Sequence, residues 1–159
     1  MNFTIRDARI EDMEQVLSLI QELAIFEKEP NAVVITVEDL KQYGYGSQPA
    51  FHCFVAEVAG EVKGMALVYP RFSTWKGKTI HLEDLVVSES MRGTGLGSAL
   101  FTEVIKYAHN LGVRRIDWNV LDWNEPAIAF YEKNGARVLR DWDVAQMDEE
   151  GIKNFISRL

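Results

Sequence analysis

The segment MRGTGLG, at positions 91–97, places three glycines within five residues directly after an arginine. It follows the apolar run LEDLVV and precedes SALFTEVIKYAHNLG, in which apolar residues recur at helical spacing. A glycine-rich turn between a strand and a helix can expose the free N–H groups and the partial positive charge of the first helical turn. Because Arg92 can add a charge-assisted contact, the segment predicts a site for an anion, although a plain tight turn fits the same glycines.

Two familiar phosphate-binding loops fit this segment poorly. A Walker A loop requires a lysine directly after its last glycine, and no lysine follows Gly97. A dinucleotide-binding fingerprint requires the spacing GxGxxG within a strand–helix–strand unit, whereas this segment reads Arg-x-x-Gly-x-Gly and follows three predicted antiparallel strands. The anion therefore has to be identified from a second motif.

Glu83 and Asp84 stand side by side inside HLEDLVV, an apolar run that predicts a strand. Neighbouring strand residues point to opposite faces, so both carboxyl groups can lie on one side only where a β-bulge intervenes. The plain alternative is that one of the two acids simply faces solvent. With either arrangement, this strand brings carboxyl groups close in sequence to the glycine-rich segment.

Apolar periodicity, capping residues and turn residues predict the elements that position these motifs. Thr36 and Asp39 form a capping-box pattern, and Asn124 is an N-cap candidate followed by Pro126. The predicted strands cover residues 2–8, 51–58, 62–72, 79–87, 114–120 and part of 136–147. The predicted helices cover residues 11–29, a segment from 36 to the glycines at 44 and 46, 96–111, 124–135 and the tail from 148.

The order of these elements predicts one mixed α+β domain over residues 1–159. The strands at 51–58 and 62–72, separated by AGE, should pair as an antiparallel hairpin, with 79–87 as a third consecutive strand. The strand–helix–strand unit over 79–120 should be parallel and right-handed. A length of 159 residues suits one compact domain.

Composition and charge limit the possible partners. The formal net charge of −7 argues against nucleic acid and mildly favours a cationic small molecule, although it could serve solubility alone. No apolar run is long enough to cross a bilayer, and the start MNFTIRDARIEDME lacks an apolar signal core, so no membrane partner and a cytoplasmic location are expected. The single Cys53 and histidines at 52, 81 and 109 show no ligand spacing, so no metal is expected.

Two motifs in the expected order resemble the GNAT superfamily of N-acetyltransferases. The pattern V-x-x-x-x-R-G-x-G-[LI]-G, from residue 87 to 97, is similar to the acetyl-CoA loop of that family. The segment NEPAIAFYEKNGA, from residue 124, is similar to its second signature, N-x-x-A-x-x-F-Y-x-x-x-G. The stretches IQELAIFEKE, TWKGKTIHLEDLVV and DWNEPAIAFYEKNGA resemble the diamine acetyltransferase branch, which includes spermidine/spermine and thialysine enzymes. The resemblance covers about residues 3–136 and weakens in the tail.

The resemblance implies a fold and a co-substrate. The fold is the acyl-CoA N-acyltransferase fold, with a central, mostly antiparallel twisted sheet of six to seven strands and about four to five helices. The co-substrate is acetyl-CoA, whose pyrophosphate would lie on the glycine-rich loop while its pantetheine arm runs along a strand backbone like an added strand. The residues implied to hold it are Leu85, Val86, Val87, Arg92, Gly93, Thr94, Gly95, Leu96, Gly97, Ser98, Asn124, Glu125, Pro126 and Ala127.

The resemblance also implies roles in catalysis. Acetyl transfer to an amine requires removal of a proton, because an alkylammonium with a pKa near 10 is only about one part in a thousand free base at pH 7. Glu83 matches the family's acceptor-site acid, a base acting through water, and Asp84 would hold the cationic amine or order water. Tyr131 matches the tyrosine that acts as general acid toward the sulfur. Transfer would be direct, within a ternary complex and without an acetyl-cysteine.

The acceptor site implied by the resemblance has aromatic walls and carboxylates, which suit a flexible aliphatic cation. The residues matched to it are Phe26, Glu27, Trp75, Glu83, Asp117, Trp118 and Asn119. The leading interpretation is acetyl transfer to a primary amine of a small polyamine, diamine or thialysine-like amino acid by a homodimer. The alternatives are another acceptor, such as an aminoglycoside or a peptide amine, and a non-catalytic acyl-CoA-binding protein. Cys53 and His81 match no residue with a role in the family, so both are expected to be structural.

Overall fold

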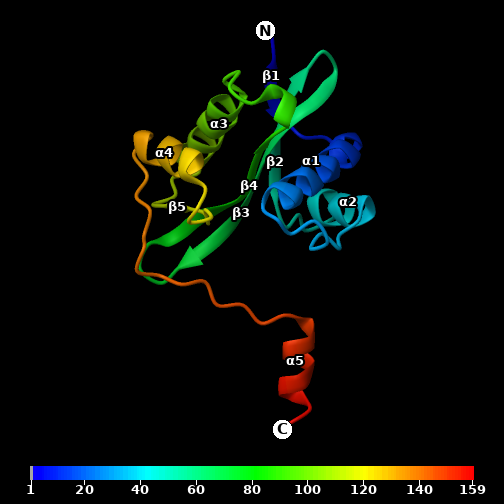
Figure 1. Ribbon diagram of the computed structural model, residues 1–159, viewed down its shortest axis with the longest axis vertical. Helices are drawn as coiled ribbons and strands as arrows, with labels where there is room; N and C mark the ends of the chain where they lie inside the picture. The colour runs from blue at the N-terminus through cyan, green and yellow to red at the C-terminus, as the bar shows by residue number, and fades with distance from the viewer. Residues whose placement is uncertain (1) are drawn as a thin grey trace. The chain divides into compact units, whose positions relative to one another are not determined.

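A five-stranded sheet organises the part of the chain that carries the glycine-rich loop (Figure 1). The computed structural model describes residues 2–159, which divide between Asn119 and Val120 into two compact units. Neighbouring strands of the first unit are antiparallel, except that the last two are parallel. In spatial order, which is also chain order, the strands are β1 (Thr4–Asp7), β2 (His52–Val58), β3 (Glu61–Ser73), β4 (Gly77–Val87) and β5 (Ile116–Asp117).

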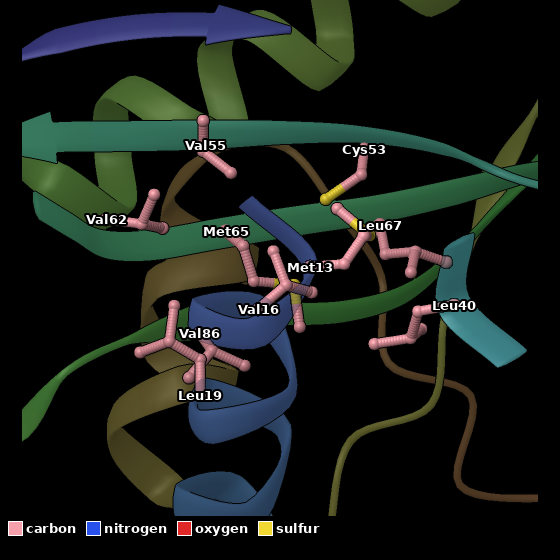
Figure 2. Close-up of a cluster of buried hydrophobic side chains, with 10 residues drawn as sticks. All are labelled: Met13, Val16, Leu19, Leu40, Cys53, Val55, Val62, Met65, Leu67 and Val86. Atoms are coloured by element: carbon pink, nitrogen blue, oxygen red, sulfur yellow. The ribbon is translucent and has the colours of Figure 1, made fainter. Parts of the chain in front are cut away.

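Three α-helices of the first unit cover the two faces of this sheet (Figure 1). The helices α1 (Met13–Phe26) and α2 (Val37–Tyr45) lie over one face, and α3 (Leu96–Asn110) lies over the other. Figure 2 shows the apolar cluster that holds the first face together. Its buried members are Met13, Val16, Leu19, Leu40, Cys53, Val55, Val62, Met65, Leu67 and Val86. Met13, Val16 and Leu19 of this cluster hold the first half of α1 against the sheet.

On the opposite face, α3 approaches the sheet closely at Gly64 of β3. A Cβ atom at that position would lie 3.1 Å from Leu100 Cδ1 and 2.9 Å from the backbone oxygen of Val86. The missing side chain therefore lets α3 pack down onto the sheet, which positions the N-terminus of the helix beside the end of β4.

The second unit contains two short helices with side-chain caps. In α4 (Glu125–Lys133), the Asn124 side chain accepts a hydrogen bond from the Ala127 N–H. In α5 (Glu149–Ile156), Asp148 Oδ1 accepts from the Gly151 N–H at 2.8 Å. Both caps satisfy N–H groups that the first helical turn leaves free, so both starts follow from local sequence. No helix within residues 2–159 combines the length and apolar character required to span a membrane.

The structure contains a β-bulge at the paired acids. Leu67 of β3 pairs with Asp84 and the next residue, Val68, pairs with Leu82, so Glu83 has no partner on β3. A bulge changes the alternation of the strand, and Asp84 therefore shares a face with Leu67 of the apolar cluster. The β-bulge that would allow Glu83 and Asp84 to lie on the same side of the sheet is therefore present.

Several predicted elements are confirmed, and the strand count is wrong. The capping box of Thr36 and Asp39 forms, the hairpin of β2 and β3 forms, and β4 and β5 are parallel. The sheet within residues 2–159 has five strands rather than six to seven. Residues 136–147 pair with no other strand of the described chain, and an extended segment without a neighbour cannot form a ladder. β5 is limited to two residues because it pairs with β4 only at Ile80 and His81.

The end of α1 also differs from the sequence prediction. The predicted helix continues to Glu29, next to Pro30, whereas α1 ends at Phe26. The backbone at Lys28 is left-handed, with φ of 66°, and the Glu29 N–H returns to the Ala24 carbonyl. This termination makes Glu27 the residue that caps the helix, so its side chain leaves from the end of α1 rather than from its flank.

Candidate acetyl-CoA and amine site

The glycine-rich loop has the backbone geometry of an anion site. Gly93 and Gly95 are left-handed, with φ of 76° and 92°, and Gly95 is the N-cap of α3. The Thr94 hydroxyl donates to the Met91 carbonyl at 2.7 Å, which holds the loop closed. In this described part of the chain, no side chain caps α3 and no acid lies in its first turn. The N–H groups of Leu96 and its successors therefore suit a bound anion.

Arg92 connects this loop to the end of α1. Its guanidinium carbon lies 5.1 Å from the centroid of the Phe26 ring, a cation–π contact. Phe26 is a predicted acceptor-site residue and Arg92 a predicted phosphate ligand, so the contact places the two predicted regions side by side. The same contact restrains the guanidinium next to the anion-binding turn.

The strand segment Leu85–Val87 is paired along one edge. Leu85, Val86 and Val87 pair with Ala66, Met65 and Gly64 of β3. On the other side, β5 pairs with β4 only at Ile80 and His81, so no strand of residues 2–159 lies beside this segment there. An extended pantetheine arm could use these backbone groups as an added strand would.

Three carboxyl groups share the region at the end of α1 and the bulge of β4. Burial raises the pKa of Glu27. Burial, followed by the charges of Glu83 and Glu27, raises the pKa of Asp84 to about 6. Like charges raise a carboxyl pKa only when they lie close together, so Glu27 and Glu83 both lie near Asp84. This acidic cluster (Glu27, Glu83 and Asp84) suits a ligand with positive charge.

A second polar cluster adjoins Glu83. His81 is 8% exposed, and its Nδ1 lies 2.6 Å from Asp117 Oδ1. Arg71 Nη1 donates to the same Asp117 oxygen at 2.9 Å, and Arg115 Nε donates to the other at 3.0 Å. On its other side, His81 Nε2 lies 3.6 Å from Glu83 Oε2. The sequence did not predict this arrangement, which the strand pairing of His81 with Asp117 creates.

The remaining predicted acceptor residues lie in different environments. Trp75 is 80% exposed in the turn between β3 and β4. Trp118 packs edge-to-face on Phe101 of α3, with ring centroids 5.7 Å apart. Asn119 is exposed. The structure thus gathers Phe26, Glu27, Glu83 and Asp84 with the loop, whereas Trp75 and Trp118 are not brought into the acidic cluster.

The second unit carries the predicted general acid on α4. Tyr131 is buried, and burial raises the pKa of its phenol to about 12. Its ring packs edge-to-face on Phe130 at 5.4 Å. Asn124 acts as a helix cap, and Glu125, Pro126 and Ala127 form the first turn of α4. A phenol with a raised pKa keeps its proton at neutral pH, which a general acid requires.

Cys53 lies inside the apolar cluster and is 4% exposed. Burial, followed by the charges of Asp12 and Asp84, raises the pKa of its thiol to about 12. The thiolate is therefore scarce at neutral pH, and the side chain is a core residue rather than a nucleophile. Within residues 2–159, no three His, Cys, Asp or Glu side chains converge so as to hold a metal ion.

Comparisons with known proteins agree with this geometry. The sequence profile described as the acetyltransferase (GNAT) family matches residues 14–136. A thialysine N-epsilon-acetyltransferase of Bos taurus is 36% identical over 165 residues, covering 97% of each chain. A spermidine/spermine N(1)-acetyltransferase-like protein 1 of Homo sapiens is 33% identical over 94% of this chain and 23% of its own length. An integron cassette protein from the V. cholerae mobile metagenome shares the fold, with TM-score 0.79, 23% identity and 98% coverage of both chains.

Proposed function

This chain belongs to the acetyltransferase (GNAT) family and is an acetyl-CoA-dependent N-acetyltransferase, and we propose that it acetylates a primary amine of a small aliphatic polycation. The acceptor class comprises polyamines, diamines and thialysine-like amino acids. The observation that carries this proposal is the acidic cluster of Glu27, Glu83 and Asp84 beside the glycine-rich loop. The charges of Glu83 and Glu27 oppose ionisation of Asp84 in the free protein, and a bound ammonium group would offset that repulsion.

Acetyl-CoA supplies an acetyl group activated as a thioester. The loop N–H groups from Gly93 to Ser98 and the Arg92 guanidinium would hold its pyrophosphate. The backbone of Leu85–Val87 would hold the pantetheine arm along the edge that β5 leaves unpaired. Asn124 to Ala127 are assigned to the same co-substrate from the family motif. These contacts would orient acetyl-CoA mainly through backbone groups, and the side chains of the sheet would contribute little to its binding.

Glu83 and Tyr131 are assigned to the two proton transfers. Glu83, on the bulge and half exposed, removes the proton from the acceptor ammonium through water. Tyr131 donates its phenolic proton to the departing sulfur. Asp84 holds the ammonium close to Glu83, and Phe26 and Glu27 contact the aliphatic chain and its far charge. Asp117, Trp118, Asn119 and Trp75 stay predictions for the acceptor side.

Acetyl transfer is tested by mixing the protein with acetyl-CoA and a panel of amines and following release of free thiol. Spermidine, short diamines and thialysine are expected to release thiol faster than an aminoglycoside or a peptide amine, because only the former carry several charges on a thin aliphatic chain. A preference for the aminoglycoside or peptide would change the acceptor assignment. No release with any amine, despite binding of coenzyme A, would identify a non-catalytic acyl-CoA-binding protein.

A Gly95→Ala variant is expected to bind coenzyme A about tenfold more weakly. A side chain at φ of 92° costs roughly 1–2 kcal/mol, which changes the loop that presents the N–H groups. Gly60→Ala is the matched control, because Gly60 has φ of 83° in the turn between β2 and β3. Calorimetric titration with coenzyme A should show the loss for Gly95→Ala alone, and equal losses in both variants would contradict a specific role of the loop.

We also propose that residues 1–159 act as one catalytic domain in the cytoplasm and that two copies form a homodimer. Support for the dimer comes from the large apolar side chains that the C-terminal segment leaves exposed. They are Leu139, Trp142, Val144, Met147, Ile152, Phe155, Ile156 and Leu159. Sedimentation velocity should give a dimer for the intact chain and a shift toward monomer for Phe155→Asp, and a monomeric intact chain would refute the proposal.

A further inference from the structure

His81 lies between two carboxyl groups that face its two ring nitrogens separately. Nδ1 is 2.6 Å from Asp117 Oδ1, and Nε2 is 3.6 Å from Glu83 Oε2. The ring is buried, whereas the Glu83 side chain is 51% exposed and reaches solvent. The side chains of Asp117 on β5 and of His81 and Glu83 on β4 therefore form a line across these two strands.

The tautomer of His81 follows from the bonding of Asp117. Burial alone would raise the pKa of Asp117, but the hydrogen bond from His81 and the charge and hydrogen bond of Arg71 lower it. Asp117 is thus an anion that accepts from Arg71 and Arg115 and has no proton to donate. His81 Nδ1 must therefore carry the proton of that contact, which leaves Nε2 as the basic nitrogen on the Glu83 side.

The charges around the ring permit a second proton on His81. From β3, Arg71 Nη1 lies 3.5 Å from Nδ1 and the Tyr69 ring lies 5.1 Å from the imidazole between centroids. Burial and then a hydrogen bond with Glu83 raise the pKa of Tyr69, so its phenol stays neutral. The Arg71 and Arg115 side chains are 54% and 38% exposed, so water screens their charge. An imidazolium would lie between the two carboxylates of Asp117 and Glu83.

We propose that His81, oriented by Asp117, is a positioning residue that takes over the proton that Glu83 removes from the acceptor ammonium. The inference rests on the proposed acetyltransferase function and deepens it. The Glu83 carboxylate takes one proton from the ammonium, leaving a neutral amine. The proton then moves from the Glu83 carboxyl group to His81 Nε2, which restores the carboxylate and forms an imidazolium between Glu83 and Asp117. The imidazolium releases the proton to water after the acetyl group has moved.

The proposed transfer from Glu83 to His81 compensates for the difference in basicity between a carboxylate and the acceptor amine. A carboxylate is in general a much weaker base than an alkylamine, so it holds the abstracted proton weakly. Imidazole is in general a stronger base than a carboxylate, so a proton on a carboxyl group can pass to a neighbouring imidazole nitrogen. Asp117 reaches His81 only because the two residues are paired partners in the parallel ladder of β4 and β5.

The test compares His81→Gln with the control His109→Gln, which changes an exposed histidine near the end of α3. Using the best amine of the panel, His81→Gln is expected to lower kcat about tenfold while the KM for acetyl-CoA stays within twofold. The acid limb of its pH–kcat profile should also move, which a structural residue would not cause. His109→Gln should match the unmodified chain. An unchanged profile and a kcat above half the original value for His81→Gln would overturn the relay.

Two further measurements test the proton transfer to His81 separately from the proposed acetyltransferase function. Added to Glu83→Gln, the His81 substitution should cause no additional loss, because the two residues act in series, and additive losses would overturn the relay. Nitrogen-15 NMR of the free protein should show a protonated Nδ1 on neutral His81, lost in Asp117→Asn, and the opposite tautomer would overturn it without any assay. An intact chain that acetylates no amine would instead refute the proposed function.

Discussion

A Tyr131→Phe variant is expected to acetylate its best amine about 100- to 1000-fold more slowly while binding coenzyme A with nearly unchanged affinity. The substitution removes only the hydroxyl group and keeps the ring that packs on Phe130. If Tyr131 protonates the departing sulfur, its loss affects the transfer step and leaves the loop at Gly93 and Gly95 intact. Steady-state rates and calorimetric titration on the same preparation measure the two quantities.

The loss of acetylation rate in Tyr131→Phe should not depend on pH near neutrality. Burial raises the pKa of Tyr131 to about 12, so the phenol carries its proton throughout the range from about pH 6 to pH 9. The ratio of the original rate to the Tyr131→Phe rate should therefore be constant across that range. Tyr43→Phe is the control, because Tyr43 is 52% exposed on α2. A ratio that shrinks as the pH rises, or an equal loss of coenzyme A affinity, would argue against the acid role.

An Asp84→Asn variant is expected to be more stable than the original chain at pH 8, by about 1–3 kcal/mol. The pKa of Asp84 is raised from 3.8 to about 6, by burial first and then by the charges of Glu83 and Glu27. The folded state therefore holds this proton more tightly than the unfolded state. Both states are protonated below about pH 4, so the penalty is absent there, grows between pH 4 and 6, and is complete above pH 6.

Urea denaturation at pH 4 and pH 8 measures this difference, and the gain in stability should be confined to the higher pH. The same variant should require about tenfold more amine for half-maximal rate, because the ammonium loses one carboxylate partner. Asp141→Asn, at an exposed position, should change neither quantity. Equal stability gains at both pH values would show that packing, and not the charge of Asp84, causes the effect.

Higher stability and weaker amine binding in Asp84→Asn would together show that Asp84 lowers the stability of the free protein and helps to bind the acceptor. Ionisation of Asp84 is unfavourable in the free protein because Asp84 is buried and lies near the charges of Glu83 and Glu27. An acceptor with several ammonium groups would neutralise them, so binding energy comes partly from relief of repulsion. Such a site discriminates against neutral amines of the same length, since they leave the repulsion in place.

Local patterns in the sequence were sufficient for most helices and for the hairpin. The capping box at Thr36, the N-cap at Asn124 and the stop at Gly112 depend on contacts within a few residues, and each element begins or ends where these residues predict. The glycine-rich loop likewise needs only positive φ values and a helix start. Short-range effects of this kind are encoded in consecutive residues and can be read directly.

The sequence by itself determined the positions of the helices apart from the end of α1, the hairpin, the glycine-rich loop and, through its two motifs, the family. Only the tertiary structure decided that Glu83 is the bulged residue, that Glu27 and Glu83 lie near Asp84, and that His81 lies opposite Asp117. It also decided that residues 136–147 pair with no strand in the described chain, contrary to their apolar pattern. The reason is that strand pairing joins residues far apart in sequence. The sequence of one segment therefore reveals neither the register of its pairing nor whether it has a partner strand.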